Sequence, residues 1–238
     1  MADAIRLHRA RHRRDSGRTL IEGPTLFDEA LTHGGRLVRV FALADDPTIG
    51  AASGVEVVVV TRPVLERLST TTTPQSPVAV IEIPAPLPPG PGDLLVAWGV
   101  GDPGNVGALL RTAAAFGMGF VAGPGTADVW SPKVLRAATG AHFRAPVGFV
   151  ADVEGLRGHP RRVLATVVAG GAVPSRPDDL PVAILVGDEA NGLPAAVAAA
   201  ADARVTIPMA AGTESLNAAV AGAIVAYAVS AGRAPGPH

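Results

Sequence analysis

The strongest constraint on the fold is an alternation, repeated along the whole chain, of short apolar β-type runs with helix-type segments. In the first third of the 238 residues, strands are predicted at 20–22, 37–43, 55–61 and 78–83. Helices are predicted between them at 24–32, where Pro stands in the first turn, and at 63–68. This order is typical of a small α/β domain. The unbroken valines of VEVVVVT, 55–61, predict a strand that is buried on both faces.

The second half repeats the alternation and ends in a long apolar helix. Strands are predicted at 94–99, 120–122, 146–150, 163–168 and 182–186. Helices are predicted at 105–116 and 131–138. The last helix, 215–230, is apolar on all sides, which indicates burial in the core or at a subunit interface.

A proline-rich run separates the two halves. IPAPLPPGPG, residues 83–92, holds five prolines, a density that favours extended polyproline geometry over any packed element. We therefore predict two domains, 1–84 and 93–238, joined by a linker at 85–92. The alternative is a surface loop within a single domain.

Composition excludes several classes of protein. Apolar residues make up 48% and charged residues 17%, so the chain is not of the disordered type. The absence of Cys excludes disulfides, a thiolate zinc site and a cysteine nucleophile. A net charge of −1 excludes a generally basic nucleic-acid binder. The sequence shows no export signal and no apolar run of membrane-spanning length, so we expect a cytoplasmic protein with neither membrane nor metal as partner.

The first 18 residues depart from this neutrality, because they hold six Arg against two Asp. One interpretation is a solvated helix face or a frayed terminus. The other is an arm that contacts phosphates, with Arg9, Arg13 and Arg14 as the contacts.

Polar residues interrupt the apolar pattern first at 102–111, DPGNVGALLR, directly after a strand and at the start of a helix. Ligands of open α/β sheets bind at such places, beyond the carboxyl ends of the strands. Asn105 is a candidate helix cap and Arg111 a candidate functional cation or a plain surface charge. The glycines suggest a phosphate loop, but the spacing is neither GxGxxG nor that of a Walker loop.

Two further segments have the same character. In ILVGDEANGLP, 184–194, a buried strand runs into Asp188 and Glu189, which point to opposite sides of an extended chain and so are not expected to act on one atom. The third segment follows IPM, 207–209, and places Ser215 and Asn217 at a helix start, where caps are favoured. Ser215 lacks a GxSxG elbow, which argues against a serine hydrolase.

Taken together, these three segments resemble, in sequence, order and spacing, the motifs of the SpoU (TrmH-like) RNA 2′-O-methyltransferase family. The resemblance covers about residues 92–231 and includes SPKVLRAATGAHFRAP. The first half resembles the L30e-like substrate-binding domain that precedes this catalytic domain, on RHRRDSGRTLIEGPTLFDEAL and STTTTPQSPVAV. It departs from that pattern at Ser76, where Gly is more frequent.

The resemblance implies a trefoil-knotted α/β methyltransferase domain with a parallel sheet, S-adenosylmethionine as cofactor, and a homodimer whose interface completes the site. It implies an RNA substrate, rRNA rather than tRNA. Carried over by position, the cofactor-binding residues are Gly187, Ile207, Met209 and Leu216. The catalytic residues are Asn105, Arg111, Glu189, Ser215 and Asn217. The RNA-binding residues are Arg9, Arg13 and Arg14.

The resemblance leaves the role of Arg111 open. A ribose hydroxyl must lose a proton, but an Arg side chain ordinarily stays protonated, so Arg111 is either an unusual base or a phosphate anchor that polarises the hydroxyl. No His stands obviously near the three motifs, and His142 is the histidine considered as an alternative base. The alternatives are a tRNA methyltransferase, a non-catalytic RNA-binding protein with the same fold, and an unrelated α/β enzyme that binds a nucleotide with the 101–107 loop.

Overall fold

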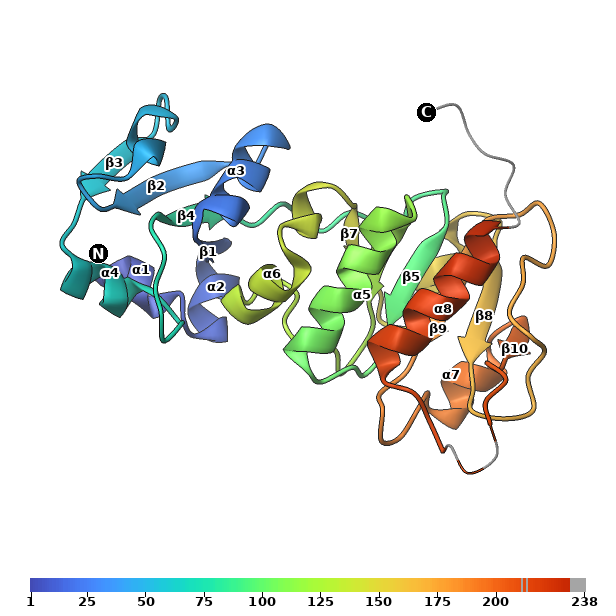
Figure 1. Ribbon diagram of the computed structural model, residues 1–238. Coiled ribbons are helices and arrows are strands. Elements are labelled where there is room, and N and C mark those ends of the chain that lie inside the picture. Colours follow the sequence, from blue (N-terminus) through green and yellow to red (C-terminus); the bar gives the residue numbers. More distant parts are fainter. Residues whose placement is uncertain (211, 213, 232–238) are drawn as a thin grey trace. The chain divides into compact units, whose positions relative to one another are not determined.

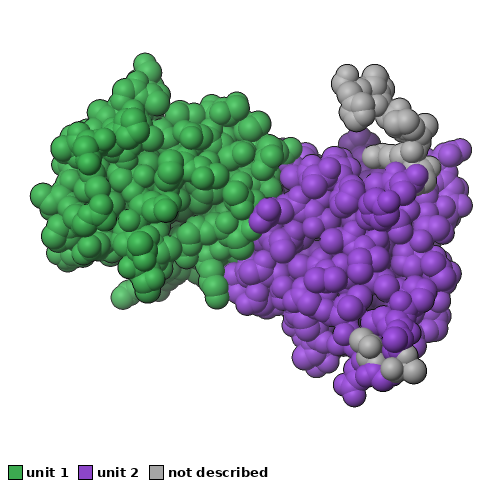
Figure 2. Space-filling model, viewed as in Figure 1, with its two compact units in different colours: residues 1–85, 128–144 green, residues 86–127, 145–238 purple. Residues whose placement is uncertain are grey.

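The computed structural model describes residues 1–210, 212 and 214–231, and the chain forms two compact units. Unit 1 consists of Met1–Ala85 and Asp128–Arg144, and unit 2 of Pro86–Ala127 and Ala145–His238 (Figure 2). No helix in the described part of the chain is long and apolar enough to cross a membrane.

Unit 1 is built on a four-stranded sheet in the order β1-β4-β2-β3. The strands are β1 (Arg18–Glu22), β2 (Leu37–Ala42), β3 (Glu56–Val59) and β4 (Val78–Glu82). Only β2 and β3 pair in parallel, since β4 runs antiparallel to both of its neighbours. The helices are α1 (Ala2–Arg6), α2 (Ala10–Ser16), α3 (Pro24–Thr32), α4 (Arg62–Leu68) and α6 (Pro132–Ala138), with 3-10 turns η1 (Pro47–Gly50) and η2 (Ala141–Phe143).

The strand with the longest run of valines is not buried on both faces. β3 lies at the edge of the sheet, and Val59 is 57% exposed. Glu56 and Val59 are exposed and the two valines between them are half-buried, so neither face of this short edge strand is fully covered.

Segment 128–144 corrects the predicted extent of the second domain. It was assigned to 93–238, but it packs with the first half of the chain. Arg13 donates from Nε to Asp128 Oδ2 (3.1 Å), and Thr19 Oγ1 donates to the carbonyl oxygen of Trp130 (2.7 Å). Helix α6 packs on β1. The segment is therefore an insertion of the second half of the chain into unit 1.

Unit 2 is built on a six-stranded, wholly parallel sheet in the order β10-β8-β9-β5-β6-β7. The strands are β5 (Leu94–Ala97), β6 (Gly119–Ala122), β7 (Val147–Phe149), β8 (Arg162–Thr166), β9 (Val182–Val186) and β10 (Ala203–Val205). The helices are α5 (Pro103–Ala115), α7 (Ala195–Ala199) and α8 (Ala218–Ala231), with the 3-10 turn η3 (Glu154–Gly158).

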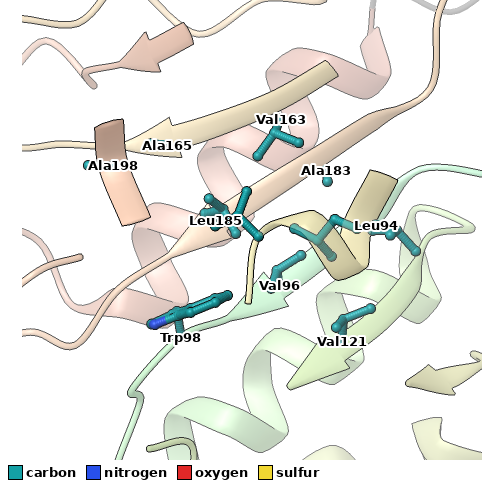
Figure 3. Packing of buried hydrophobic residues seen from close by; sticks show 11 residues of the cluster. Leu94, Val96, Trp98, Val121, Val163, Ala165, Ala183, Leu185 and Ala198 are labelled. Atoms are coloured by element: carbon teal, nitrogen blue, oxygen red, sulfur yellow. The ribbon is translucent and has the colours of Figure 1, made fainter. Parts of the chain in front are cut away.

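The central strands of this sheet are fully buried. β9 has five buried residues in a row, as expected for a parallel strand covered on both faces. On one face Val96, Trp98 and Leu185 form a core with residues of the neighbouring strands (Figure 3). On the opposite face α5 and α8 pack against each other and against β5 and β9, respectively. This rigid frame holds the loops at the carboxyl ends of the strands.

Helix α8 starts later than predicted, and within one chain it is buried on one side only, which leaves the predicted alternative of a subunit interface open. It begins at Ala218 rather than at residue 215. Val225 and Val229 are buried, whereas Val220, Ile224 and Tyr227 are 47%, 40% and 65% exposed. Within one chain, the helix therefore leaves an apolar stripe uncovered.

Candidate active site

A cavity of about 500 Å³ lies at the carboxyl ends of β8, β9 and β10 in unit 2. Its lining comes from the segments that follow these strands and from the start of α8: 166–168, 186–192, 205, 207, 209, 214–216, 218 and 221. This is the place where an open parallel sheet binds its ligands. The predicted cofactor residues Gly187, Ile207, Met209 and Leu216 all line it, as do the predicted catalytic residues Glu189 and Ser215.

Gly187 is required by the close approach of two backbone segments. A Cβ atom there would lie 2.3 Å from the carbonyl carbon of Gly192 and 2.4 Å from the nitrogen of Leu193. The loop is closed by a hydrogen bond from Gly192 N to the carbonyl oxygen of Asp188 (2.8 Å). No residue with a side chain fits at 187 without displacing this wall of the cavity.

Asp188 and Glu189 have different partners, as the alternation of an extended chain predicted. Asp188 Oδ1 accepts from the backbone nitrogens of Ala190 (3.0 Å) and Asn191 (3.2 Å) and so shapes the turn. Glu189 Oε1 accepts from Nδ2 of Asn105. Glu189 therefore connects the second motif with the first.

Asn217 extends this connection to the third motif. Its Nδ2 donates to Oδ1 of Asn105 (2.9 Å), and its Oδ1 accepts from the backbone nitrogens of Ala219 (3.0 Å) and Val220 (3.2 Å). Glu189, Asn105 and Asn217 thus form a continuous chain of hydrogen bonds between residues more than 80 positions apart. Asn217 also caps α8, as predicted for this position.

Asn105 does not cap helix α5. The cap is Asp102, whose Oδ1 accepts from the backbone nitrogen of Asn105 (3.0 Å). With that donor satisfied by Asp102, the side-chain amide of Asn105 is free to bridge Glu189 and Asn217.

Arg111 is separate from this cluster. It follows Asn105 by six residues on α5, which is about 240° around the helix and about 9 Å along it. The side chain is exposed, does not line the cavity and has no hydrogen bond or ion pair with the described residues. A single copy of the chain does not bring Arg111 to the cavity.

Several lining residues were not predicted. Thr166, Val167 and Val168 form one wall, and Glu214 contributes a carboxylate. Thr166, Val167 and Val168 end the strand predicted at 163–168. Ligands of open parallel sheets bind at the carboxyl ends of the strands, so the argument that pointed to the other motifs also applied to these three residues. Three carboxylates, Asp188, Glu189 and Glu214, line the cavity and no Lys, Arg or His does so among the described residues.

His142 lies outside the site. It belongs to unit 1, where Nε2 donates to the carbonyl oxygen of Val129 (2.8 Å) and the ring packs against Trp130. Burial lowers its pKa from 6.5 to about 4, in spite of that hydrogen bond, which raises it. A buried, neutral ring of this kind is a packing residue.

One of the three arginines predicted to bind RNA is buried. Arg13 is 4% exposed, pairs with Asp128 and donates from Nη1 to the carbonyl oxygens of Leu7 (2.7 Å) and His8 (3.0 Å). The prediction of Arg13 as an RNA contact is therefore wrong, since its donors are used inside unit 1. Arg9 and Arg14 are exposed and have no side-chain partner in the described part of the chain.

The cavity at the carboxyl edge of the parallel sheet is placed where α/β proteins of this class bind nucleotides and other small ligands. The model of the SpoU rRNA Methylase family matches residues 93–227, and that of the MRM3-like substrate binding domain matches residues 3–79. The chain belongs to the SpoU rRNA methylase family. This confirms the predicted family and, at the level of class, the predicted RNA methyltransferase.

Relatives of full length support this placement. The chain is 33% identical over 232 residues to the 23S rRNA (guanosine(2553)-2′-O)-methyltransferase RlmP of Bacillus subtilis, with 94% of this chain and 93% of the relative covered. The AdoMet complex of AviRb from Streptomyces viridochromogenes is 26% identical, with a TM-score of 0.87 over 97% and 96% of the chains. An AdoMet-bound rRNA methyltransferase from Sinorhizobium meliloti is 31% identical, with a TM-score of 0.82 over 95% and 92%. The predicted α/β class with a substrate-binding domain ahead of it is confirmed.

Proposed function

We propose that the chain transfers the methyl group of S-adenosylmethionine to a ribose 2′-hydroxyl of rRNA in the cytoplasm. The observation that carries this proposal is the hydrogen-bonded chain Glu189–Asn105–Asn217 beside the cavity, which brings the three motifs to one place. The named activity of the Bacillus subtilis relative supports the substrate and the position of methylation.

The cavity fits the cofactor in size and in chemistry. Its volume of about 500 Å³ lies in the usual range for ligand sites. Val186, Ile207 and Leu216 offer apolar walls for the adenine and the aliphatic chain, with Gly187 and Met209 beside them. The three lining carboxylates suit the positive charge of a sulfonium. These residues would hold the cofactor, which supplies an activated methyl group.

The transfer is an in-line displacement, and the protein contributes mainly alignment. When bound, S-adenosylmethionine would supply a methyl group on its positively charged sulfur and leave as the neutral thioether, while the proton of the ribose hydroxyl would pass to water. We assign Ser215 and Asn217 to placing the ribose, and Asn105 and Glu189 to fixing Asn217. Arg111 anchors the adjacent phosphate and polarises the hydroxyl, a role that a permanently charged guanidinium can perform.

Arg111 reaches a cavity only if a second copy of the chain completes the site. The exposed stripe Val220, Ile224 and Tyr227 lies on α8, which packs beside α5, the helix that carries Arg111. A homodimer formed through this stripe would cover it and present Arg111 to the partner. The trefoil knot that the family resemblance implies belongs to the same proposal, because knotted loops would fix the cavity walls.

Mixing two inactive variants tests this arrangement. If Arg111 acts on the partner's cavity, co-refolded Arg111→Ala and Gly187→Ala chains form heterodimers with one intact site. Assayed at a cofactor concentration too low to fill the Gly187→Ala cavity, they restore about a quarter of the activity. Action within one chain restores none. Ile224→Glu, which places a charge in the stripe, is expected to give monomers in light scattering, whereas exposed Val173→Glu leaves the dimer intact.

Calorimetric titration with S-adenosylmethionine, followed by transfer of labelled methyl groups to purified rRNA and tRNA, tests the function. Binding and labelling of rRNA are expected. Labelling of tRNA alone would assign the other substrate. A folded dimer that binds rRNA but neither binds the cofactor nor transfers methyl would be an RNA-binding protein.

A further inference from the structure

The three carboxylates that line the cavity differ in what they bind. Oδ1 of Asp188 accepts from two backbone nitrogens of its own turn, at 3.0 and 3.2 Å. Oε1 of Glu189 accepts from Nδ2 of Asn105. Glu214 has no hydrogen bond or ion pair with the residues that the structure describes. Within the described lining, Glu214 therefore offers a carboxylate that the protein itself does not use.

Glu214 lies on the wall of the cavity that the third motif provides. Ser215 and Leu216, which follow it, also line the cavity. The next residue, Asn217, is fixed at the start of α8, and its Nδ2 donates to Oδ1 of Asn105 (2.9 Å). The side chain of Glu214 is exposed, so a ligand in the cavity can reach its carboxylate. This carboxylate directly precedes Ser215, which we assign to placing the ribose.

The charge of Glu214 is not compensated by the cavity wall. Among the described residues, no Lys, Arg or His lines the cavity. The attraction between a carboxylate and a cation falls with distance and with the dielectric constant, and a cavity screens it less than open water does. A ligand with a positive charge beside Glu214 is therefore bound more tightly than an otherwise identical neutral ligand.

We propose that Glu214 determines specificity for the charged form of the cofactor. It raises the affinity of the cavity for S-adenosylmethionine, whose sulfur is positively charged, relative to S-adenosylhomocysteine, whose sulfur is neutral. The proposal rests on the proposed function, which makes the first compound the cofactor and the second the product. Both compounds carry the same adenosine, ammonium and carboxylate groups, so contacts with these groups do not distinguish them. Discrimination at sulfur favours the replacement of product by fresh cofactor.

The dissociation constants of the two compounds, measured by calorimetry on the full chain, test the inference. Glu214→Gln, which keeps the shape and removes the charge, is expected to weaken the binding of S-adenosylmethionine about tenfold and that of S-adenosylhomocysteine less than about twofold. Glu214→Asp, which keeps the charge, should retain most of the discrimination. Asp179→Asn is the matched control, because it removes an exposed carboxylate of unit 2 that does not line the cavity. Both constants should remain at the wild-type values in this control.

The salt dependence of the two constants gives a second readout. Raising the KCl concentration from about 0.05 M to about 0.5 M shortens the distance over which charges act. In the wild type, the dissociation constant of the product divided by that of the cofactor should therefore fall. In Glu214→Gln this ratio should fall less, because the charge at position 214 is absent.

Equal losses of affinity for both compounds in Glu214→Gln would overturn the inference, since the carboxylate would then bind a group that the two compounds share. Unchanged constants for both compounds would also overturn it. Failure of the proposed function has a different signature, because the folded wild-type chain would then bind neither compound or transfer no methyl group to rRNA. Wild-type binding and transfer, together with wild-type constants in Glu214→Gln, would refute the role of Glu214 alone.

Discussion

The two units use their polar residues in opposite ways. In unit 2, polar side chains from three distant segments converge at the carboxyl edge of one sheet, beside a cavity. In unit 1, polar side chains are used to join segments: Arg13 binds Asp128, Thr19 binds the carbonyl of Trp130, and Glu22 accepts from Ser69 and Thr71.

This difference explains which sites could be predicted. The position of a site at the edge of a parallel sheet follows from the order of strands and helices, which the sequence displays. The pairing of a surface arginine follows from tertiary packing, which the sequence does not display. A charged residue of unit 1 can therefore be assigned to a binding site only when its partners in the fold are known.

The largest effect is expected from Arg111→Ala. Loss of a group that stabilises the transferring centre typically slows an enzyme about a thousandfold. Because Arg111 does not line the cavity, the dissociation constant for S-adenosylmethionine should change less than about twofold. Single-turnover rates and calorimetry measure the two quantities. Retained turnover would remove Arg111 from the mechanism.

Gly187→Ala tests the cavity itself. Its Cβ would lie 2.3 Å from the backbone of Gly192, so the loop must move and cofactor affinity should fall about a hundredfold. Gly158→Ala is the control, because it lies in unit 2 with no atom within 4 Å of the added Cβ. Equal affinity in the two variants would show that the loop 187–192 does not shape the binding site.

Arg13→Met tests the structural role of the buried arginine. The substitution removes an ion pair and leaves Asp128, which is 34% exposed, without its partner, so the free energy of unfolding should fall by about 2 kcal/mol. Arg11→Met, at an exposed pair with Asp15, should change it by less than about 0.5 kcal/mol. Urea unfolding measures both. A stable Arg13→Met with weakened RNA binding would restore the original prediction.

The smallest effect concerns His142 and pH. Its folded pKa of about 4 lies below the ordinary 6.5, so between these values the unfolded chain binds a proton that the folded chain does not. Stability is therefore lost as the pH falls through this window, by about 1.4 kcal/mol at pH 5.5. The variant His142→Gln should not show this loss of stability on acidification. The variant His159→Gln, which changes an exposed histidine, should show it as the wild type does. If the free energy of unfolding of the wild type and of His142→Gln changed with pH in the same way, the lowered pKa of His142 would be contradicted.

Much of the fold was predictable from the pattern of apolar runs. Strands β5 and β9 and helices α3 and α5 lie where the sequence placed them, because each has a clear apolar period and a Pro or Gly at an end. Strand β10 was missed, since three residues with two exposed side chains carry no such period. The predicted burial of β3 was also wrong, because a run of valines does not reveal where a strand lies in its sheet.

The site was predictable as a set of motifs but not as a geometry. Motif positions placed Gly187, Ile207, Met209 and Leu216 in one cavity. The bridging role of Asn105 could not be foreseen, because it depends on Asp102 taking the cap. The insertion of 128–144 into unit 1 was equally hidden, since it depends on contacts between residues more than 100 positions apart.

The most direct test of the account is to map the methyl group on the RNA. Methylation of a 2′ oxygen blocks alkaline cleavage of the following phosphodiester, so rRNA treated with the enzyme and labelled S-adenosylmethionine should gain label and one alkali-resistant position. Arg111→Ala should give neither. Label on a base, with every phosphodiester still cleaved by alkali, would contradict transfer to the ribose.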